Sequence, residues 1–295
     1  MRRVVVILAL AACKPQFDQA PSQVHEPRIL AVRGTPAEGR PGTTVAYDAL
    51  IVAPDGSSPA SNEAWAYCNV PKPLDENNTV ATGCTSSDQN MQIGTGPMAM
   101  GDLPLAACSL FGPDPPPQMP GQPPLRPRDP DITGGYYQPV RIETDTLLGF
   151  GLERITCNLA QAGTDIAVQF GQQYKPNENP TLWPLTSTTP IDAIPSGATV
   201  TLTAWWPPES VESFPVYDPS TLTLVPHRET MRVSWFASDG SFAHDHTGRD
   251  ESEMDDWTSN DWTAPKSAET VHLWIVLRDS RGGVDFASYE LTVTP

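Results

Sequence analysis

Residues 270–293 read TVHLWIVLRDSRGGVDFASYELTV, and this stretch decides the fold class. Apolar residues alternate with others through 270–278, as they do in strands, whose successive side chains point to opposite faces. One face of this run would carry Val271, Leu273, Ile275 and Leu277, and the other His272, Trp274, Val276 and Arg278. The loop DSRGG at 279–283 supplies glycines for the positive φ angles of a tight turn, and 284–293 follows as a second run. The stretch predicts a β-hairpin.

The same period of two recurs along the chain and predicts an all-β protein. Strand-like runs fall at 29–34, 44–49, 64–68, 138–142, 151–157, 166–174, 198–205 and 231–237. The 295 residues also include 33 prolines and 21 glycines, which interrupt helices but suit β-domains with many turns.

A break in the strand pattern at 175–180 (KPNENP) predicts a domain boundary, with one domain over 27–175 and a second over 176–295. The second half repeats the plan of the first. A Pro-Ser-Gly turn at 195–197 precedes one strand-like run, as Arg-Pro-Gly at 40–42 precedes another. This correspondence predicts two copies of one strand plan.

Residues 71–135 depart from the strand pattern and predict a long irregular insertion in the first domain. They are rich in Pro, Gly, Asn and Asp, and nine of the eighteen residues in 113–130 are proline. The run 113–130 cannot form a helix or a central strand. Long irregular loops inside a domain are often functional, and they need something that keeps them in place.

Four cysteines, Cys68, Cys84, Cys108 and Cys157, supply that constraint. An even number in an exported chain predicts two disulfides, for which three pairings exist. The pairing of Cys68 with Cys84 and of Cys108 with Cys157 closes the shorter loops and is favoured. The pairing of Cys68 with Cys157 and of Cys84 with Cys108 is an alternative. A zinc site is disfavoured because no C-x₂-C pair is present.

The first thirteen residues predict export and lipid anchoring. Two arginines precede nine apolar residues, which is a secretory signal too short to span a bilayer. Leu10-Ala11-Ala12-Cys13 resembles the bacterial lipobox, which implies a signal peptide over 1–12 and acylation of Cys13. Two or three acyl chains give a stable anchor. In that family Lys14, in place of Asp, favours the outer membrane, and polar residues 13–26 would form a tether.

Charge excludes one class of partner and suggests a cofactor. The formal net charge is −17, which argues against nucleic acid as a partner because a basic surface is needed for that. Acidic residues concentrate between 245 and 261, where Asp245, Asp250 and Asp255 are candidate Ca²⁺ ligands. The alternative is a solvated acidic loop that prevents edge pairing.

Tryptophans are the candidate binding residues. Trp205 and Trp206 lie on opposite faces of a strand end, so that one belongs to the core and the other is free to contact a partner. We predict Trp206, Trp257 and Trp262 as the contact residues, with a sugar ring or a protein as the partner. The alternative is that these tryptophans are core residues.

Two resemblances follow from these residues. The order of turn, strand, strand with Trp235 and late D-x-x-G-G hairpin resembles bacterial immunoglobulin-like and PKD-like domains of envelope proteins. The whole chain is similar to envelope lipoproteins of the myxobacterial type. That second resemblance rests on PKPLDENN (71–78), LFGPDPPP (110–117), RPRDPDITGGYYQPVR (126–141), FGLERITCNLA (150–160) and LWIVLRDSRGGVDFASYELTV (273–293). It implies a compartment and tandem immunoglobulin-like β-sandwiches, but no reaction.

No catalytic motif stands out. The sequence contains neither a G-x-S-x-G nucleophile elbow nor an H-E-x-x-H zinc motif. We therefore predict a non-enzymatic lipoprotein of the cell envelope that binds an envelope protein or glycan, or that serves as a structural module. The alternatives are a calcium-dependent adhesin or carbohydrate-binding module, and a hydrolase without a recognisable motif.

Overall fold

The computed structural model describes residues 21–59, 62–70, 80–86, 88, 90–111, 120, 132–159 and 162–295. The predicted signal peptide, Cys13 and the tether up to residue 20 lie outside the described residues. So does the proline-rich run 113–130, apart from Pro120. Within the described part, no helix is long and apolar enough to span a bilayer.

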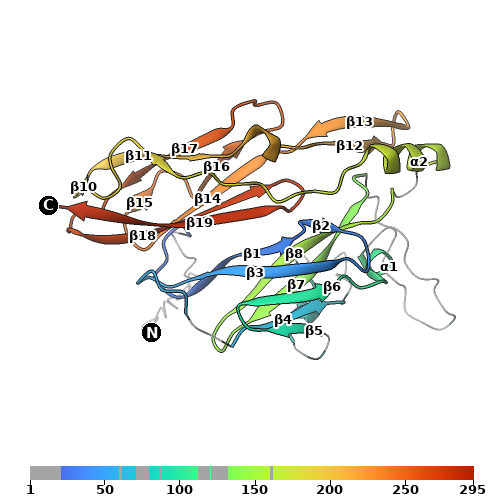
Figure 1. Ribbon diagram of the computed structural model, residues 1–295, viewed down its shortest axis with the longest axis horizontal. Coiled ribbons are helices and arrows are strands. Elements are labelled where there is room, and N and C mark those ends of the chain that lie inside the picture. Colours follow the sequence, from blue (N-terminus) through green and yellow to red (C-terminus); the bar gives the residue numbers. More distant parts are fainter. Residues whose placement is uncertain are drawn as a thin grey trace, which may run out of the picture.

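The first domain is a sandwich of two mainly antiparallel sheets (Figure 1). One sheet has the order β1-β3-β6 and the other β2-β8-β7-β4-β5. The strands are β1 (Arg28–Thr35), β2 (Glu38–Gly39), β3 (Thr44–Val52), β4 (Ala64–Cys68), β5 (Asn90–Thr95), β6 (Met98–Asp102), β7 (Gly135–Glu143) and β8 (Leu148–Thr156). Alternate residues of both sheets meet between them, among them the buried side chains of Tyr47, Trp65, Tyr67 and Ile142.

The second domain has the same strand order as the first, with β15 added at the edge of one sheet. Its sheets have the orders β15-β17-β11-β9 and β10-β19-β18-β14-β16. The strands are β9 (Thr186–Ser187), β10 (Ile194–Pro195), β11 (Thr199–Trp205), β14 (Met231–Ala237), β15 (Ser241–Phe242), β16 (His246–Arg249), β17 (Trp257–Thr263), β18 (Glu269–Asp279) and β19 (Val284–Thr294). In each domain a two-residue strand pairs in parallel with the last strand, β2 with β8 and β10 with β19. Both domains are immunoglobulin-like sandwiches.

The segment 166–174, predicted as a strand, is a helix, α2 (Thr164–Gln173). Ile166, Val168 and Phe170 alternate with other residues, as they would in a strand. Val168 is 56 % exposed, however, so the three side chains do not share a buried face. Phe170 and Tyr174 stack with ring centroids 4.8 Å apart at the four-residue spacing of a helix face. They pack beside Tyr217 on the hairpin of β12 (Ser213–Asp218) and β13 (Thr223–Arg228), which follows the 3₁₀ turn η3 (Pro208–Ser210).

The prediction that 71–135 is irregular is wrong in its middle. This segment supplies the turn η1 (Thr82–Thr85), strands β5 and β6, and the short helix α1 (Ala107–Phe111). The inward residues of β6 are small because Tyr67 needs the space: a Cβ on Gly101 would lie 2.9 Å from the Tyr67 hydroxyl. Because its inward residues are small, β6 lacks the alternation of large apolar and polar side chains that identifies a strand in a sequence.

The disulfides are Cys68–Cys84 and Cys108–Cys157, the pairing that closes the shorter loops. The first joins the end of β4 to η1, and the second joins α1 to the residue after β8. Both lie in the first domain, where they tie Cys84 and Cys108 of the insertion to the strands that flank it.

The two domains lie side by side (Figure 1), with the β18–β19 sheet against β1 and β3. The second face of β18, which carries Trp274 and Val276, is buried against Leu30, Leu50 and Val52 of the first domain. Arg33 completes this contact: its guanidinium bonds Asp48 of β3 and Asp285 of β19, both at 2.7 Å. Strand β18 is therefore apolar on both faces because one face lies in the core of its own domain and the other lies in the domain interface.

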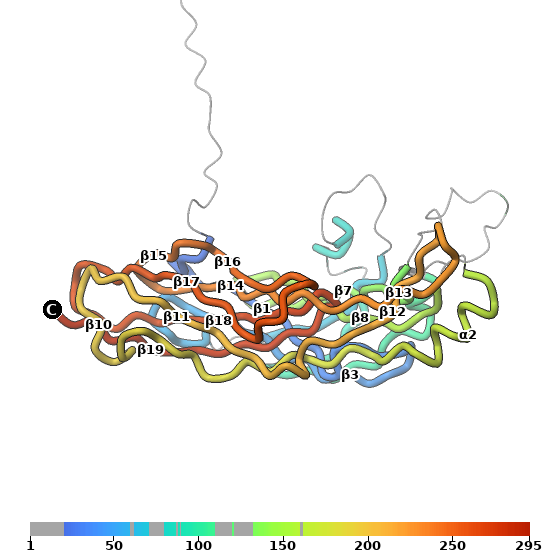
Figure 2. Tube along the Cα trace, turned by 90° about the horizontal axis from the view of Figure 1, so that it is seen from above, coloured from blue at the N-terminus to red at the C-terminus, as the bar shows by residue number. Residues whose placement is uncertain are grey.

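The predicted tether ends earlier than residue 26. Val24 donates its N–H to the Ala237 carbonyl at 2.9 Å, and the N–H of Ala237 bonds the Ser22 carbonyl at 2.9 Å. The Val24 side chain is fully buried in the domain interface. Viewed from above, in Figure 2, the described chain accordingly begins beside the second domain, close to β15 and β16.

Candidate functional site

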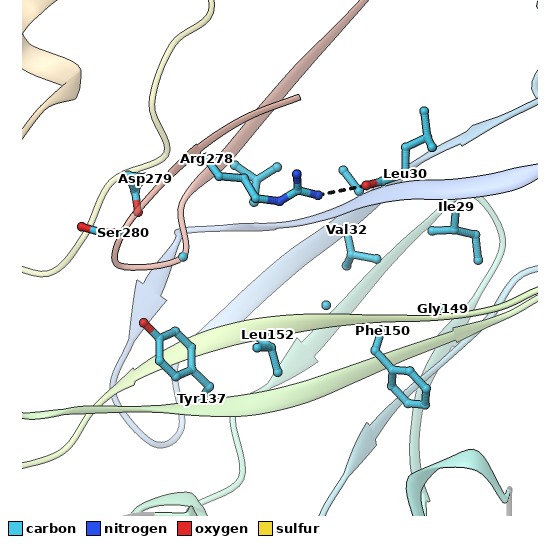
Figure 3. A pocket seen from close by; sticks show the side chains of 14 residues that line it. Ile29, Leu30, Val32, Tyr137, Gly149, Phe150, Leu152, Arg278, Asp279 and Ser280 are labelled. Atoms are coloured by element: carbon cyan, nitrogen blue, oxygen red, sulfur yellow. Dashed lines mark hydrogen bonds between the residues drawn. The ribbon is translucent and has the colours of Figure 1, made fainter. Parts of the chain in front are cut away.

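A cleft of about 350 Å³ opens between the domains (Figure 3). Strand β1 contributes Ile29 and Val32, strand β8 contributes Leu152, strand β7 contributes Tyr137, and the β18–β19 loop closes the cleft. Two glycines of β8 let the walls approach: a Cβ on Gly149 would lie 2.9 Å from Ile29, and a Cβ on Gly151 would lie 2.6 Å from Val32. The cleft is an apolar seam where the edge strand β1 passes β8.

The polar side chains that line this cleft already have partners. Arg278 donates to the Leu30 carbonyl at 2.9 Å, where β1 has a bulge. Burial lowers the pKa of Arg278, and the neighbouring charge of Arg232 adds to this. Tyr137 donates its hydroxyl to the Arg281 carbonyl at 3.2 Å. The Ser280 hydroxyl accepts the N–H of Thr230 at 3.3 Å. These groups position the hairpin.

Asp279 shapes the loop that closes the cleft. Its carboxylate accepts the backbone N–H groups of Arg281 at 2.8 Å and of Gly283 at 2.9 Å. The Asn177 amide donates to it at 3.2 Å. Gly282 has a φ of 106°, a conformation that favours glycine. The loop therefore points the Arg281 side chain away from the cleft and into a buried cluster of charges.

Arg281 is the centre of this interdomain charge cluster. Its Nε donates to Glu229 at 2.6 Å and its Nη2 to Glu212 at 2.5 Å. Its Nη1 bonds the Lys175 carbonyl at 2.9 Å. Glu38 of the first domain lies 3.8 Å from Nη1. One guanidinium thus ties both domains and the segment that links them.

Glu38 anchors the cluster in the first domain. Its carboxylate accepts the Tyr174 hydroxyl at 2.7 Å and the Asn177 N–H at 2.8 Å. Arg154 of β8 lies 3.4 Å from it. No sequence motif marks this cluster, because its members come from six separate segments. The two charged residues in the DSRGG loop, Asp279 and Arg281, were its one local signal.

Acids outnumber bases in the cluster, and the pKa values of several buried acids are raised. Burial raises the pKa of Glu229 to about 7, with the charge of Asp279 adding to the shift. Burial likewise raises the pKa of Asp279 and of Glu212. Burial lowers the pKa of Arg281, but the charges of Glu229 and Tyr174 outweigh that effect, so its pKa is raised.

Stability is therefore expected to fall as pH rises from about 5 to 8. Glu229 ionises above about 4.5 in the unfolded chain but near 7 in the folded protein, so folding becomes less favourable between these values. The expected loss is on the order of 3 kcal/mol. Urea unfolding at pH 5 and pH 8 measures it. Glu229→Gln should remove most of this slope, and an unchanged slope in that variant would contradict the assignment to Glu229.

The structure corrects two of the three predicted contact tryptophans. Trp206 and Trp262 are 0 % exposed and belong to the core of the second domain. In β11 the inward residues are Val200, Leu202 and Ala204, and continuing that period places Trp206 inward and Trp205 outward. The supposed loop around Trp262 is strand β17, whose alternation buries Thr258, Asn260 and Trp262. The alternation itself was the signal that identifies Trp205.

Trp257, the third predicted contact residue, is half-buried on the outer face of its sheet. It pairs across the strands with Trp205, and their ring centroids are 5.8 Å apart. The guanidinium carbon of Arg249 lies 4.9 Å from the Trp257 ring centre.

Two of the three candidate calcium ligands have side-chain partners in the protein. Asp245 accepts the Ser22 hydroxyl at 2.8 Å, and Asp255 lies 3.6 Å from Arg249. For Asp250 it is the backbone N–H that is bonded, to the Glu253 carboxylate at 2.8 Å, so its own carboxylate takes no part in this contact. No group of three or more His, Cys, Asp and Glu residues in the described part is placed to hold a metal ion. Calcium stays a prediction from the sequence.

Comparisons with known proteins give structural neighbours only. No family model matches the sequence, and no curated protein matches it. Solved structures that align include the adhesin InvE of Yersinia pseudotuberculosis, at 9 % identity and a TM-score of 0.25, over 90 % of this chain and 58 % of the adhesin chain. This chain therefore spans just over half the length of that adhesin.

Two further neighbours have similar scores. The fibronectin(III)-like modules of Clostridium thermocellum CbhA align at 11 % identity and a TM-score of 0.26, over 91 % of this chain and 94 % of theirs. Domains 4 and 5 of the S-layer protein SbsC align at 9 % identity and a TM-score of 0.21, over 58 % of this chain and 69 % of theirs. TM-scores this low support no inference about function.

Proposed function

We propose that this protein is a non-enzymatic lipoprotein of the bacterial outer membrane that presents a rigid two-domain body to an envelope partner. The observation that supports it best is the interlock of the domains. A buried apolar interface and one charge cluster fix their orientation, so the outer faces and loops form one defined surface. Rigid scaffolds that present exposed residues are typical of binding modules.

The cleft supports a structural role over a catalytic one. Its charged groups are held in hydrogen bonds that shape the backbone, as Asp279 shapes the β18–β19 loop and Arg278 holds the β1 bulge. A catalytic acid or base needs a proton-transfer partner on the substrate, and these groups already bind the protein's own N–H and C=O groups.

The start of the described chain supports an anchor that holds the body close to the membrane. Cys13 lies eight residues before Pro21, which spans at most about 28 Å when fully extended. From Ser22 onward the chain is joined to β14 of the second domain. A lipid on Cys13 would therefore hold the end of the second domain that carries β15 and β16 nearest to the membrane.

Cys13→Ser is expected to abolish membrane partitioning. The variant loses the thiol that lipid modification requires, and we expect unprocessed or soluble protein in fractionated cells. Intact mass of the wild-type protein, extracted from membranes of a lipoprotein-processing host, should fit cleavage before Cys13 plus acyl chains. Membrane partition of a correctly cleaved Cys13→Ser form would contradict the anchor.

A further inference from the structure

The outer face of the β15-β17-β11-β9 sheet carries an aromatic pair that the domain interlock does not use. Trp205 of β11 and Trp257 of β17 are cross-strand partners, with ring centroids 5.8 Å apart and planes tilted by 40°. Both are half-buried, and the opposite face of their sheet is the core of the second domain. In Figure 1 this sheet lies on the side of the second domain away from β1 and β3.

Polar contacts hold both indoles in place. The Trp205 Nε1 donates to the Thr186 hydroxyl of β9 at 2.9 Å, which fixes that ring over the sheet. The Arg249 guanidinium stacks on Trp257. Arg249 is itself held by Glu253 at 3.8 Å and by Asp255 at 3.6 Å. Rings that are already oriented lose little conformational entropy on binding.

Hydroxyl and carboxylate groups continue along the same face. Next to the tryptophan pair are the cross-strand partners Thr203 and Ser259, and beyond them Thr201 donates to Asp261 at 2.7 Å. The face therefore combines an apolar ring platform with a row of hydrogen-bonding groups. That combination matches a pyranose ring, which has an apolar C–H face and a rim of hydroxyls.

We infer that Trp205, Trp257 and Arg249 form a binding site for a neutral glycan. A sugar would lie beside the Arg249 guanidinium and stack on Trp205 and on the part of the Trp257 ring that Arg249 does not cover. Its hydroxyls would reach Arg249 and the Asp255 carboxylate. An anionic polymer fits poorly, because Arg249 is already paired with two carboxylates and the protein carries a net charge of −17. The inference deepens the proposed binding role by naming its partner class, and it does not depend on the anchor.

Binding of the full-length protein to an array of neutral glycans tests this inference. The protein is purified in a detergent without a sugar head group, and the array covers glucose, galactose, mannose and N-acetylhexosamine oligosaccharides. We expect at least one class to bind, and expect Trp257→Ala and Trp205→Ala each to weaken that binding at least tenfold. Trp257→Phe, which keeps an aromatic ring, should bind more tightly than Trp257→Ala.

Met254→Ala is the matched control, because Met254 is a 77 % exposed apolar residue close to Trp257 in the chain. It should leave glycan binding unchanged, and all four variants should keep the circular dichroism spectrum of the wild type. Absence of binding to every neutral glycan would overturn the inference, and so would binding that survives Trp257→Ala. Either result leaves the Cys13 fractionation experiment, and with it the proposed anchoring, unaffected.

Discussion

Replacing Arg281 with methionine is expected to lower the free energy of unfolding by about 3–5 kcal/mol, because buried carboxylates lose their cation. Glu229 and Glu38 are both fully buried, and Arg281 is the cation nearest to Glu229, at 2.6 Å. Methionine keeps much of the side-chain volume, so lost charge pairing dominates the effect. Urea denaturation at pH 7 measures the change.

Two further variants test whether this loss of stability comes from the buried charge pairing. Arg40→Met removes an exposed arginine of the first domain and should change stability by less than about 0.5 kcal/mol. Adding Glu229→Gln to Arg281→Met should restore part of the loss, since it removes one unpaired carboxylate. A loss below about 1 kcal/mol for Arg281→Met would show that the cluster does not depend on its central cation.

Trp274→Ala is expected to cost about 3–5 kcal/mol and to separate the unfolding of the two domains. Trp274 is 2 % exposed and packs against the first domain rather than into its own sandwich core. Its removal leaves a cavity in the interface while both cores stay intact. Calorimetry should show two transitions in place of one.

Trp183→Ala provides the tryptophan control for that experiment. Trp183 is 45 % exposed, so it buries less apolar surface and its loss should change stability by about 1 kcal/mol or less. Both variants lose the same side chain, and the difference between them isolates the interface. Equal effects of the two substitutions would contradict the role assigned to Trp274.

Alternation in the sequence was sufficient for the long central strands of the second domain. The runs 231–237, 270–278 and 284–293 correspond within one residue to β14, β18 and β19. Val271, Leu273, Ile275 and Leu277 share one face, as predicted, and that face lies in the core of the second domain. The reason is that each of these strands turns an apolar face toward the core, and a one-residue slip would move that face out of the core.

Features that depend on tertiary contacts were not predictable in this way. β6 was not predicted from the sequence, because its inward positions hold Ala99 and Gly101 in place of large apolar residues. The helix α2 was misassigned because its short apolar run fits both periods. The charge cluster around Arg281 joins segments more than 240 residues apart, from Glu38 to Arg281. Local sequence patterns cannot predict contacts between such distant segments.

Differential scanning calorimetry of the unmodified full-length protein tests the rigid two-domain body most directly. An interface that buries Trp274 and Val276, together with the Arg281 cluster, should make both domains unfold together. We predict a single transition whose calorimetric enthalpy equals its van't Hoff enthalpy. Two separable transitions in the wild-type protein would show that the domains fold independently and would contradict the rigid surface on which the proposed function rests.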